Sequence, residues 1–167
     1  MRCEMRTYDV DINADFTCKH CGSPVTTLSW VSGVVHRNHC PYCLHSRHLD
    51  LFKPGDRLSA CRNIMVPVGL TLKKRKDKFS QNSQGELMLV HHCTGCEGLS
   101  INRIAADDDP QVVMGVFETR FMNQDQLIER CCRSGIQLLQ DEDRPLIQTR
   151  LFGSYVELWD QKTYSIN

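Results

Sequence analysis

The chain has 167 residues, and its 20 Lys and Arg balance its 20 Asp and Glu. This length allows one ordinary domain or two very small ones. The N-terminal segment has no apolar run with a small-residue cleavage site, and no segment approaches the roughly 20 apolar residues of a membrane span. We therefore expect a soluble cytoplasmic protein, in which the ten cysteines stay reduced and bind metal ions rather than form disulfides.

The neutral overall charge hides an uneven distribution. Residues 16–103 carry twelve Lys and Arg against five acids, whereas residues 111–167 carry six basic and eight acidic side chains. Cysteine-bound zinc ions would lower the positive charge of the first segment, but would not cancel it. The first segment is therefore the candidate nucleic-acid-binding part.

Two Cys-x2-Cys pairs follow a polar N-terminal tail of residues 1–15. Cys18 and Cys21 form the first pair and Cys40 and Cys43 the second, with 18 residues between the pairs. This spacing is typical of a tetrahedral four-cysteine zinc site built from two tight turns. The second pair also spells Cys-Pro-Tyr-Cys, the dithiol of glutaredoxins, so a redox role is the alternative. The upstream pair favours zinc, because a redox dithiol needs no second pair.

An antiparallel pair of strands is predicted further along the chain. Residues 64–72 and 86–91 are short apolar segments typical of strands. The polar segment between them is either a solvated loop or a basic finger that enters a phosphate-lined groove. Its cations are Lys73, Lys74, Arg75, Lys76 and Lys78.

A third Cys-x2-Cys pair, Cys93 and Cys96, needs two more ligands to complete a zinc site. Cys61 is the remaining cysteine of the basic segment, so the fourth ligand should be a histidine. We favour His48 over His91, because a ligand two residues before the turn would strain it. Both sites are closed and hence structural, and two Zn²⁺ ions would supply much of the folding free energy.

The C-terminal third is predicted to form a β-α-β-β appendage with a small core of its own. We expect a strand at residues 112–121, a helix between Asn123 and Gly135, and a hairpin over residues 146–159. The predicted fold class is α+β. It comprises the tail (1–15), a small β-rich zinc-ribbon-like module with two structural metal sites (16–110) and the appendage (111–167).

Four motifs stand in the chain in this order: HRNHCPYCLHSRHLD, PGDRLSAC, VHHCTGC and NRIAADDDP. Together they resemble the RNHCP family of small prokaryotic zinc-ribbon-like proteins, over about residues 16–110. The resemblance implies the cysteine ligands named above, with His48 and His91 both at motif positions. It also marks polar residues that zinc geometry does not require: Arg37, Asn38, His39, Asn102, Arg103, Asp107 and Asp108.

These features favour a zinc-stabilised RNA-binding protein that is associated with the ribosome or with translation. Two closed zinc sites would give a small rigid scaffold, and its basic and polar side chains would contact phosphates or unpaired bases of rRNA. The candidate contact residues are Arg37, Asn38, His39, Arg47, Arg57, Arg62, Lys73, Lys74, Arg75, Lys76, Lys78 and Arg103.

A zinc-dependent hydrolase or nuclease is the alternative. It would use residues 37–39 and the acids at 107–109, and it would need an open coordination position and an activated nucleophile. The sequence has no His-Glu-x-x-His motif that would supply them. A redox switch that releases zinc is a third possibility. Salt dependence separates RNA binding from the other two, because phosphate contacts weaken as salt rises.

Overall fold

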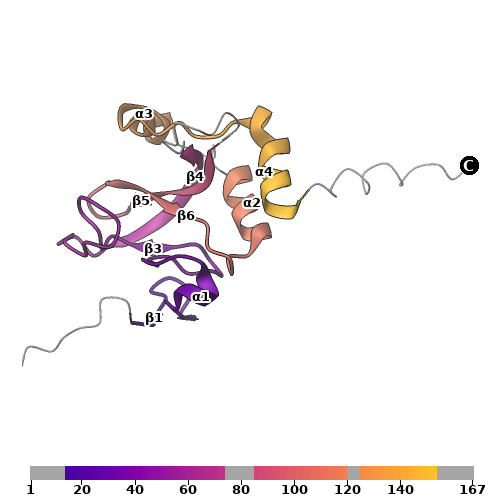
Figure 1. Ribbon diagram of the computed structural model, residues 1–167. Coiled ribbons are helices and arrows are strands. Elements are labelled where there is room, and N and C mark those ends of the chain that lie inside the picture. Colours follow the sequence, from indigo (N-terminus) through magenta and orange to yellow (C-terminus); the bar gives the residue numbers. More distant parts are fainter. Residues whose placement is uncertain (1–13, 74–84, 120–124, 154–167) are drawn as a thin grey trace, which may run out of the picture.

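A four-stranded antiparallel sheet forms the centre of the protein, and helices cover both of its faces (Figure 1). The computed structural model describes residues 14–73, 85–119 and 125–153. In chain order, the elements are β1 Phe16–Thr17, β2 Pro24–Val25, α1 Ser29–Ser32, β3 Ser46–Arg47, β4 Ile64–Lys73, β5 Glu86–Cys93, β6 Leu99–Arg103, α2 Pro110–Thr119, α3 Asp125–Arg133, a 3-10 turn Asp141–Asp143 and α4 Arg144–Phe152. The mixture of sheet and helix confirms the α+β class.

The long strands β4 and β5 confirm the predicted antiparallel pair. Leu70 stands opposite Leu89, and Met65 stands opposite Cys93. The short strand β3 extends the sheet beside β4, and β6 extends it beside β5, which gives the order β3-β4-β5-β6. β6 is therefore an edge strand, and no other strand in the described part of the chain pairs with its outer side.

Each face of the sheet has its own hydrophobic core. On one face, Leu70 shares a core with Phe117 of α2 and Ile147 of α4, and these two helices lie side by side in Figure 1. On the other face, Val90 shares a core with Leu127 of α3. Burying each such side chain stabilises the fold by roughly 1.5–3 kcal/mol. The C-terminal helices thus complete the cores of the sheet, and the expectation that they have a separate core is wrong.

The predicted strand at residues 112–121 is also wrong, because residues 110–119 form α2. Its start has a helix signal: Asp109 Oδ1 accepts a hydrogen bond from the amide of Gln111 at 2.8 Å, and Pro110 occupies the first turn. Its buried residues, Val113, Met114, Val116 and Phe117, recur with helical spacing. Apolar β-branched residues suggested a strand, but burial against the sheet stabilises the helix.

The hairpin predicted over residues 146–159 is wrong in its first half, since α4 spans Arg144–Phe152. Pro145 stands in its first turn and Gly153 follows its last residue, as is common at helix ends. The second half of that hairpin lies outside the described residues. By contrast, α3 confirms a helix before Gly135, which has a positive φ of 71°.

The N-terminal ribbon has the smallest of the hydrophobic cores found among the described residues. β1 pairs with β2, and Val25 shares a small core with Cys18 and Cys40. Such a core is too small to hold the ribbon together without a further crosslink. Across the described ranges, no helix has the length and apolar character needed to cross a bilayer.

Candidate metal centres and the cleft beside them

The first candidate metal centre, site 1, lies in the N-terminal ribbon. It consists of Cys18, Cys21, Cys40 and Cys43, whose sulfur atoms all lie within 4.8 Å of one another. Each Cys-x2-Cys pair sits on a tight turn closed by a backbone hydrogen bond. The structure therefore brings together the four cysteines whose spacing predicted a common site.

The sulfur separations at site 1 fit a bound ion. Cys18 Sγ lies 3.6 Å from Cys43 Sγ, and Cys21 Sγ lies 3.6 Å from Cys40 Sγ. Four thiolates at about 2.3 Å from a zinc ion would stand about 3.8 Å apart, whereas disulfide sulfurs lie about 2.05 Å apart. The group could hold a metal ion, and four thiolates would close its coordination shell.

The second candidate centre, site 2, joins three segments of the chain. Its residues are His48, which follows β3, Cys61, which precedes β4, and Cys93 and Cys96, which flank the turn between β5 and β6. Cys61 Sγ lies 3.5 Å from Cys93 Sγ, and Cys96 Sγ lies 3.1 Å from His48 Nδ1. This group, too, could hold a metal ion.

His91, the competing ligand, has other partners. Its ring is fully buried, Nε2 donates a hydrogen bond to the carbonyl oxygen of Leu44 at 2.7 Å, and Nδ1 accepts one from Asn102 Nδ2 at 2.9 Å. Burial lowers the pKa of His91 to about 3. His91 is thus a neutral core residue, and His48 is the histidine that the structure brings to site 2.

One thiol in each centre has a lowered pKa. The side-chain hydroxyl and backbone amide of Ser23 lower the pKa of Cys21 to about 6. The side-chain amide and backbone amide of Asn63 do the same for Cys61, whose pKa is also about 6. These hydrogen-bond donors stabilise the thiolate, which is the form that binds metals.

A pair of histidines beside site 1 was not predicted as a pair. The rings of His20 and His45 stack with their centroids 3.5 Å apart. Together with Cys43 they form a third group that could hold a metal ion. Sequence spacing does not predict this stacking, because it depends on the folding of both Cys-x2-Cys turns.

A buried ionic network links the ribbon to the segment after β6. The Arg37 guanidinium, fully buried, donates from Nη1 to Asp107 Oδ2 at 2.7 Å and from Nη2 to Asp108 Oδ1 at 3.2 Å. His39 Nε2 lies 2.8 Å from Asp108 Oδ2, which also accepts the amide of Ala105 at 2.7 Å. The two acids thus compensate the buried guanidinium and orient the imidazole.

A second buried cluster is centred on Asp50. Its carboxylate accepts hydrogen bonds from Asn38 Nδ2 and from the amide of Gly55, both at 2.9 Å. The Arg57 guanidinium lies 3.4 Å from Asp50 Oδ1 and also donates to Asn38 Oδ1. The charge of Asp50 is therefore compensated inside the protein.

Four residues of these two clusters were predicted to contact RNA. The residues concerned are Arg37, Asn38, His39 and Arg57, all of them buried. Arg37 and Arg57 are already paired with carboxylates, and Asn38 and His39 are bonded to Asp50 and Asp108, so these buried side chains are not exposed to contact RNA. The same pairing uses Asp107 and Asp108, and within the described ranges no candidate metal group includes them. The nuclease hypothesis thus gains no support from this network.

The other predicted contact residues lie at the surface or beyond the described ranges. Arg62 and Lys73 are exposed, Arg47 is half-buried, and the exposed Arg103 pairs with Glu86 at 3.0 Å. The remaining four, Lys74, Arg75, Lys76 and Lys78, lie outside the described residues.

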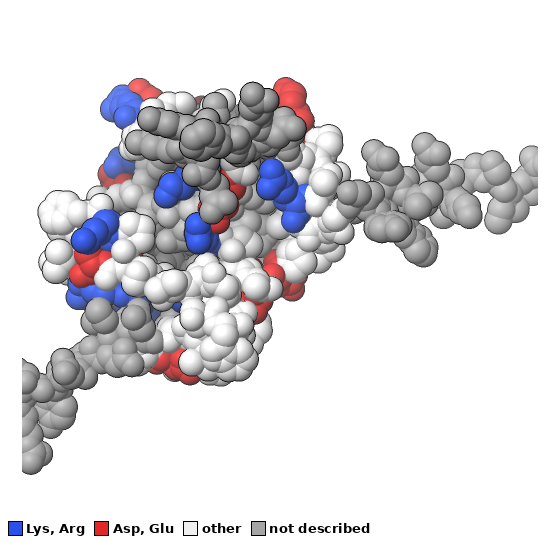
Figure 2. All heavy atoms as spheres, in the orientation of Figure 1, with Lys and Arg blue, Asp and Glu red and all other residues white. Residues whose placement is uncertain are grey.

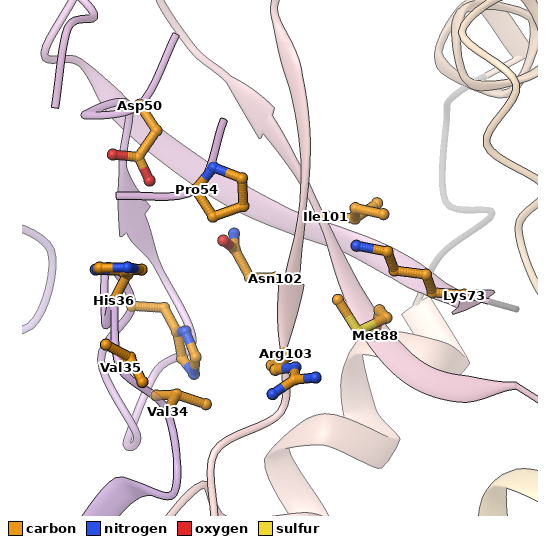
Figure 3. A pocket seen from close by; sticks show the side chains of 11 residues that line it. Val34, Val35, His36, Asp50, Pro54, Lys73, Met88, Ile101, Asn102 and Arg103 are labelled. Carbon is orange, nitrogen blue, oxygen red and sulfur yellow. The ribbon is translucent and has the colours of Figure 1, made fainter. Parts of the chain in front are cut away.

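A cleft runs along β6. It consists of two adjoining cavities of about 410 and 400 Å³. Residues of β6 form one wall, and the loop that contains Asp50 and Pro54, together with residues 34–36, forms the other (Figure 3). Lys73 extends from the end of β4 toward Ile101 of β6. Both cavities are lined by Asp50, Pro54, Lys73, Ile101 and Asn102.

Comparison with known proteins gives one family. The family model described as the RNHCP domain matches residues 13–114, which is more than half of the chain. No curated protein and no solved structure matches the chain. The matched region contains all eight residues of sites 1 and 2 and the Arg37 network, while α3 and α4 follow it. The chain belongs to the RNHCP domain family.

Proposed function

We propose that this protein is a zinc-stabilised RNA-binding module, with one structural Zn²⁺ ion in each of sites 1 and 2. The favoured partner is ribosomal RNA in the cytoplasm, because the sequence combines a small cysteine-rich scaffold with a positive segment. The metal ions would fix the surface that meets the RNA and would take no part in catalysis.

The charge of the cleft is the observation that carries this proposal. Arg47, Lys53 and Lys73 line it, and none of the three has a carboxylate partner in the part of the chain that the structure describes. The acid among the described lining residues, Asp50, is already paired with Arg57. Figure 2 shows Lys and Arg side chains in the middle of one face of the molecule, with Asp and Glu side chains among them. Unpaired cations around a cleft attract a polyanion.

The donor sets support zinc in a structural role. Four cysteines at site 1, and three cysteines with one histidine at site 2, are typical of closed tetrahedral zinc centres. A closed centre leaves no position for a substrate or a water nucleophile. Elemental analysis of the purified protein should give two zinc ions per chain.

The first test is fractionation of a native cell lysate on sucrose gradients at low and high salt. We expect the protein to migrate with ribosomal particles at low salt and to leave them as salt rises, because phosphate contacts release counterions. A protein that stays at the top of the gradient at every salt concentration would contradict docking on the ribosome.

The second test measures binding of the purified, zinc-loaded protein to RNA as a function of salt. Substitution of Arg47, Lys53 or Lys73 by Ala should each reduce the slope of log K against log salt by about 0.7. Lys19→Ala is the matched control, since Lys19 is exposed and does not line the cleft. Binding that does not change with salt would exclude the proposed phosphate contacts.

A further inference from the structure

We infer that the cleft along β6 binds an unpaired RNA strand, with its phosphates at the Lys53 and Lys73 rim and a base stacked on Phe52. This inference rests on the proposed function and adds the site and the kind of RNA. It depends on three features of the cleft: its fixed walls, its exposed aromatic residue and its size.

The two walls of the cleft are joined at both ends. At one end, site 2 contains His48 from the loop wall and Cys96 from the turn that leads into β6, with His48 Nδ1 3.1 Å from Cys96 Sγ. At the other end, Arg37 and His39 bind Asp108, which follows β6, and Asn38 between them donates to Asp50 of the loop wall at 2.9 Å. A cleft held at both ends is formed before the ligand arrives, which lowers the entropic cost of binding.

Phe52 stands exposed on a loop that is itself fixed. Its side chain is 83% exposed, although burial of an aromatic ring would stabilise the protein. The loop is held by Asp56, whose Oδ2 accepts the amides of Phe52 at 2.8 Å and Lys53 at 3.0 Å. An exposed ring on a rigid loop at the rim of a basic cleft is what a base-stacking site requires.

The size of the cleft favours a single strand. Cavities of about 410 and 400 Å³ lie at the lower end of the range for small-molecule sites, so each accommodates a group of nucleoside size. A duplex keeps its bases stacked inside and presents only its backbone and grooves. An unpaired strand can place a base beside Phe52 and a second one beside Asn102, whose Oδ1 is free to accept a hydrogen bond within the described part of the chain.

A peptide is the competing occupant, because β6 is an edge strand to which an extended peptide could add. The charges favour RNA: the unpaired cations Arg47, Lys53 and Lys73 line the same space. A peptide bound through the β6 backbone would need neither these cations nor Phe52.

The experiment measures fluorescence anisotropy of the zinc-loaded full chain with two labelled probes, a 12-nucleotide oligouridine and a 12-base-pair RNA duplex. Phe52→Ala should weaken oligouridine binding about 5- to 150-fold, which is the range for loss of one base stack. Trp30→Ala is the matched control, because Trp30 is 80% exposed and lines neither cavity. We expect it to bind like the wild type.

Each other outcome overturns the inference in a distinguishable way. Equal affinity for duplex and oligouridine, or equal losses for Phe52→Ala and Trp30→Ala, would place RNA elsewhere on the protein and leave the proposed function standing. Absence of binding to either probe at low salt would remove the proposed function as well. A labelled polyglutamate peptide is measured in the same way, and its binding with no RNA binding would overturn the inference in favour of an acidic peptide.

Discussion

Arg37 donates its hydrogen bonds to carboxylates that lie about 70 residues further along the chain. A guanidinium in the interior is costly unless it is paired, because it loses its hydration. Asp107 and Asp108 supply the compensating charge, and Asp108 also accepts from the backbone of Ala105. This contact fixes the start of α2 against the N-terminal ribbon, so a motif residue with the chemistry of a phosphate ligand has a structural task.

Removal of this buried charge tests whether Arg37 stabilises the fold. Arg37→Met should lower the free energy of unfolding by about 3–5 kcal/mol, since it leaves two carboxylates without their cation. Arg133→Met is the control, because Arg133 pairs with Glu129 on the exposed face of α3 and should cost at most about 1 kcal/mol. Urea unfolding with saturating zinc measures both. A similarly small loss of unfolding free energy in both variants would show that the Arg37 network contributes little to stability.

The metal ligands and the Arg37 network differ in how far sequence alone could predict them. Ligands such as Cys18 and Cys21 are separated by only two residues within one turn, so their closeness in the sequence makes them close in space as well. Arg37 and Asp108 are far apart in the sequence, and only the folded protein brings them together. The positive charge of Arg37 therefore suggested RNA, because its buried partner was not apparent.

At the scale of elements, β4 and β5 were predictable and α2 and α4 were not. The two strands are mostly apolar segments that follow one another in the chain and pair antiparallel. In α2 the apolar residues resemble a strand locally, and the helix is decided by the Asp109 cap and by packing onto the sheet. Tertiary burial thus outweighed local propensity, which is the weaker term.

The loop that carries Phe52 depends on a single carboxylate. Asp56 accepts four backbone amides, those of Leu51, Phe52, Lys53 and Leu58. Asp56→Asn should accelerate hydrogen exchange at the first three amides, because an Asn side chain has one acceptor oxygen and no charge. Asp125→Asn, at the exposed start of α3, removes a charge elsewhere and should leave this exchange unchanged.

The pH dependence of the same loop follows from the pKa of Asp56. Burial raises that pKa, but the four backbone hydrogen bonds outweigh burial and hold it below the ordinary value of 3.8. The stabilisation is therefore fully present above the ordinary pKa and is lost only as the pH falls through the lower value of the folded state. Protection of these amides should not change between about pH 7 and pH 5. Loss of protection within that range would contradict an ionised, hydrogen-bonded Asp56.

For the whole molecule, the two candidate metal centres have different positions relative to the cleft. Site 1 crosslinks the ribbon, whose apolar core is small. Site 2 joins the loop wall to the β6 wall, so its ligands fix the width of the cleft directly. Loss of the metal ion at site 2 should therefore weaken RNA binding in the cleft, even though the metal ligands do not have to contact the RNA.

Cys96→Ser tests this coupling by removing one ligand of site 2. We expect bound zinc to fall from two ions to one per chain, because a centre with three ligands and a weak hydroxyl binds zinc poorly. The matched control is Cys132→Ser, since Cys132 is exposed on α3 and belongs to neither centre. This control should retain both ions.

The consequence for the cleft is measured on the same two variants. In Cys96→Ser, the amides of β6 should exchange faster and oligouridine should bind more weakly, because His48 no longer ties the loop wall to the turn before β6. The core around Phe117 lies on the face covered by α2 and should keep its protection. Loss of protection in both places would mean that the metal holds the whole fold rather than the cleft. Loss of zinc with no change in the exchange of the β6 amides or in oligouridine affinity would show that site 2 does not affect the cleft.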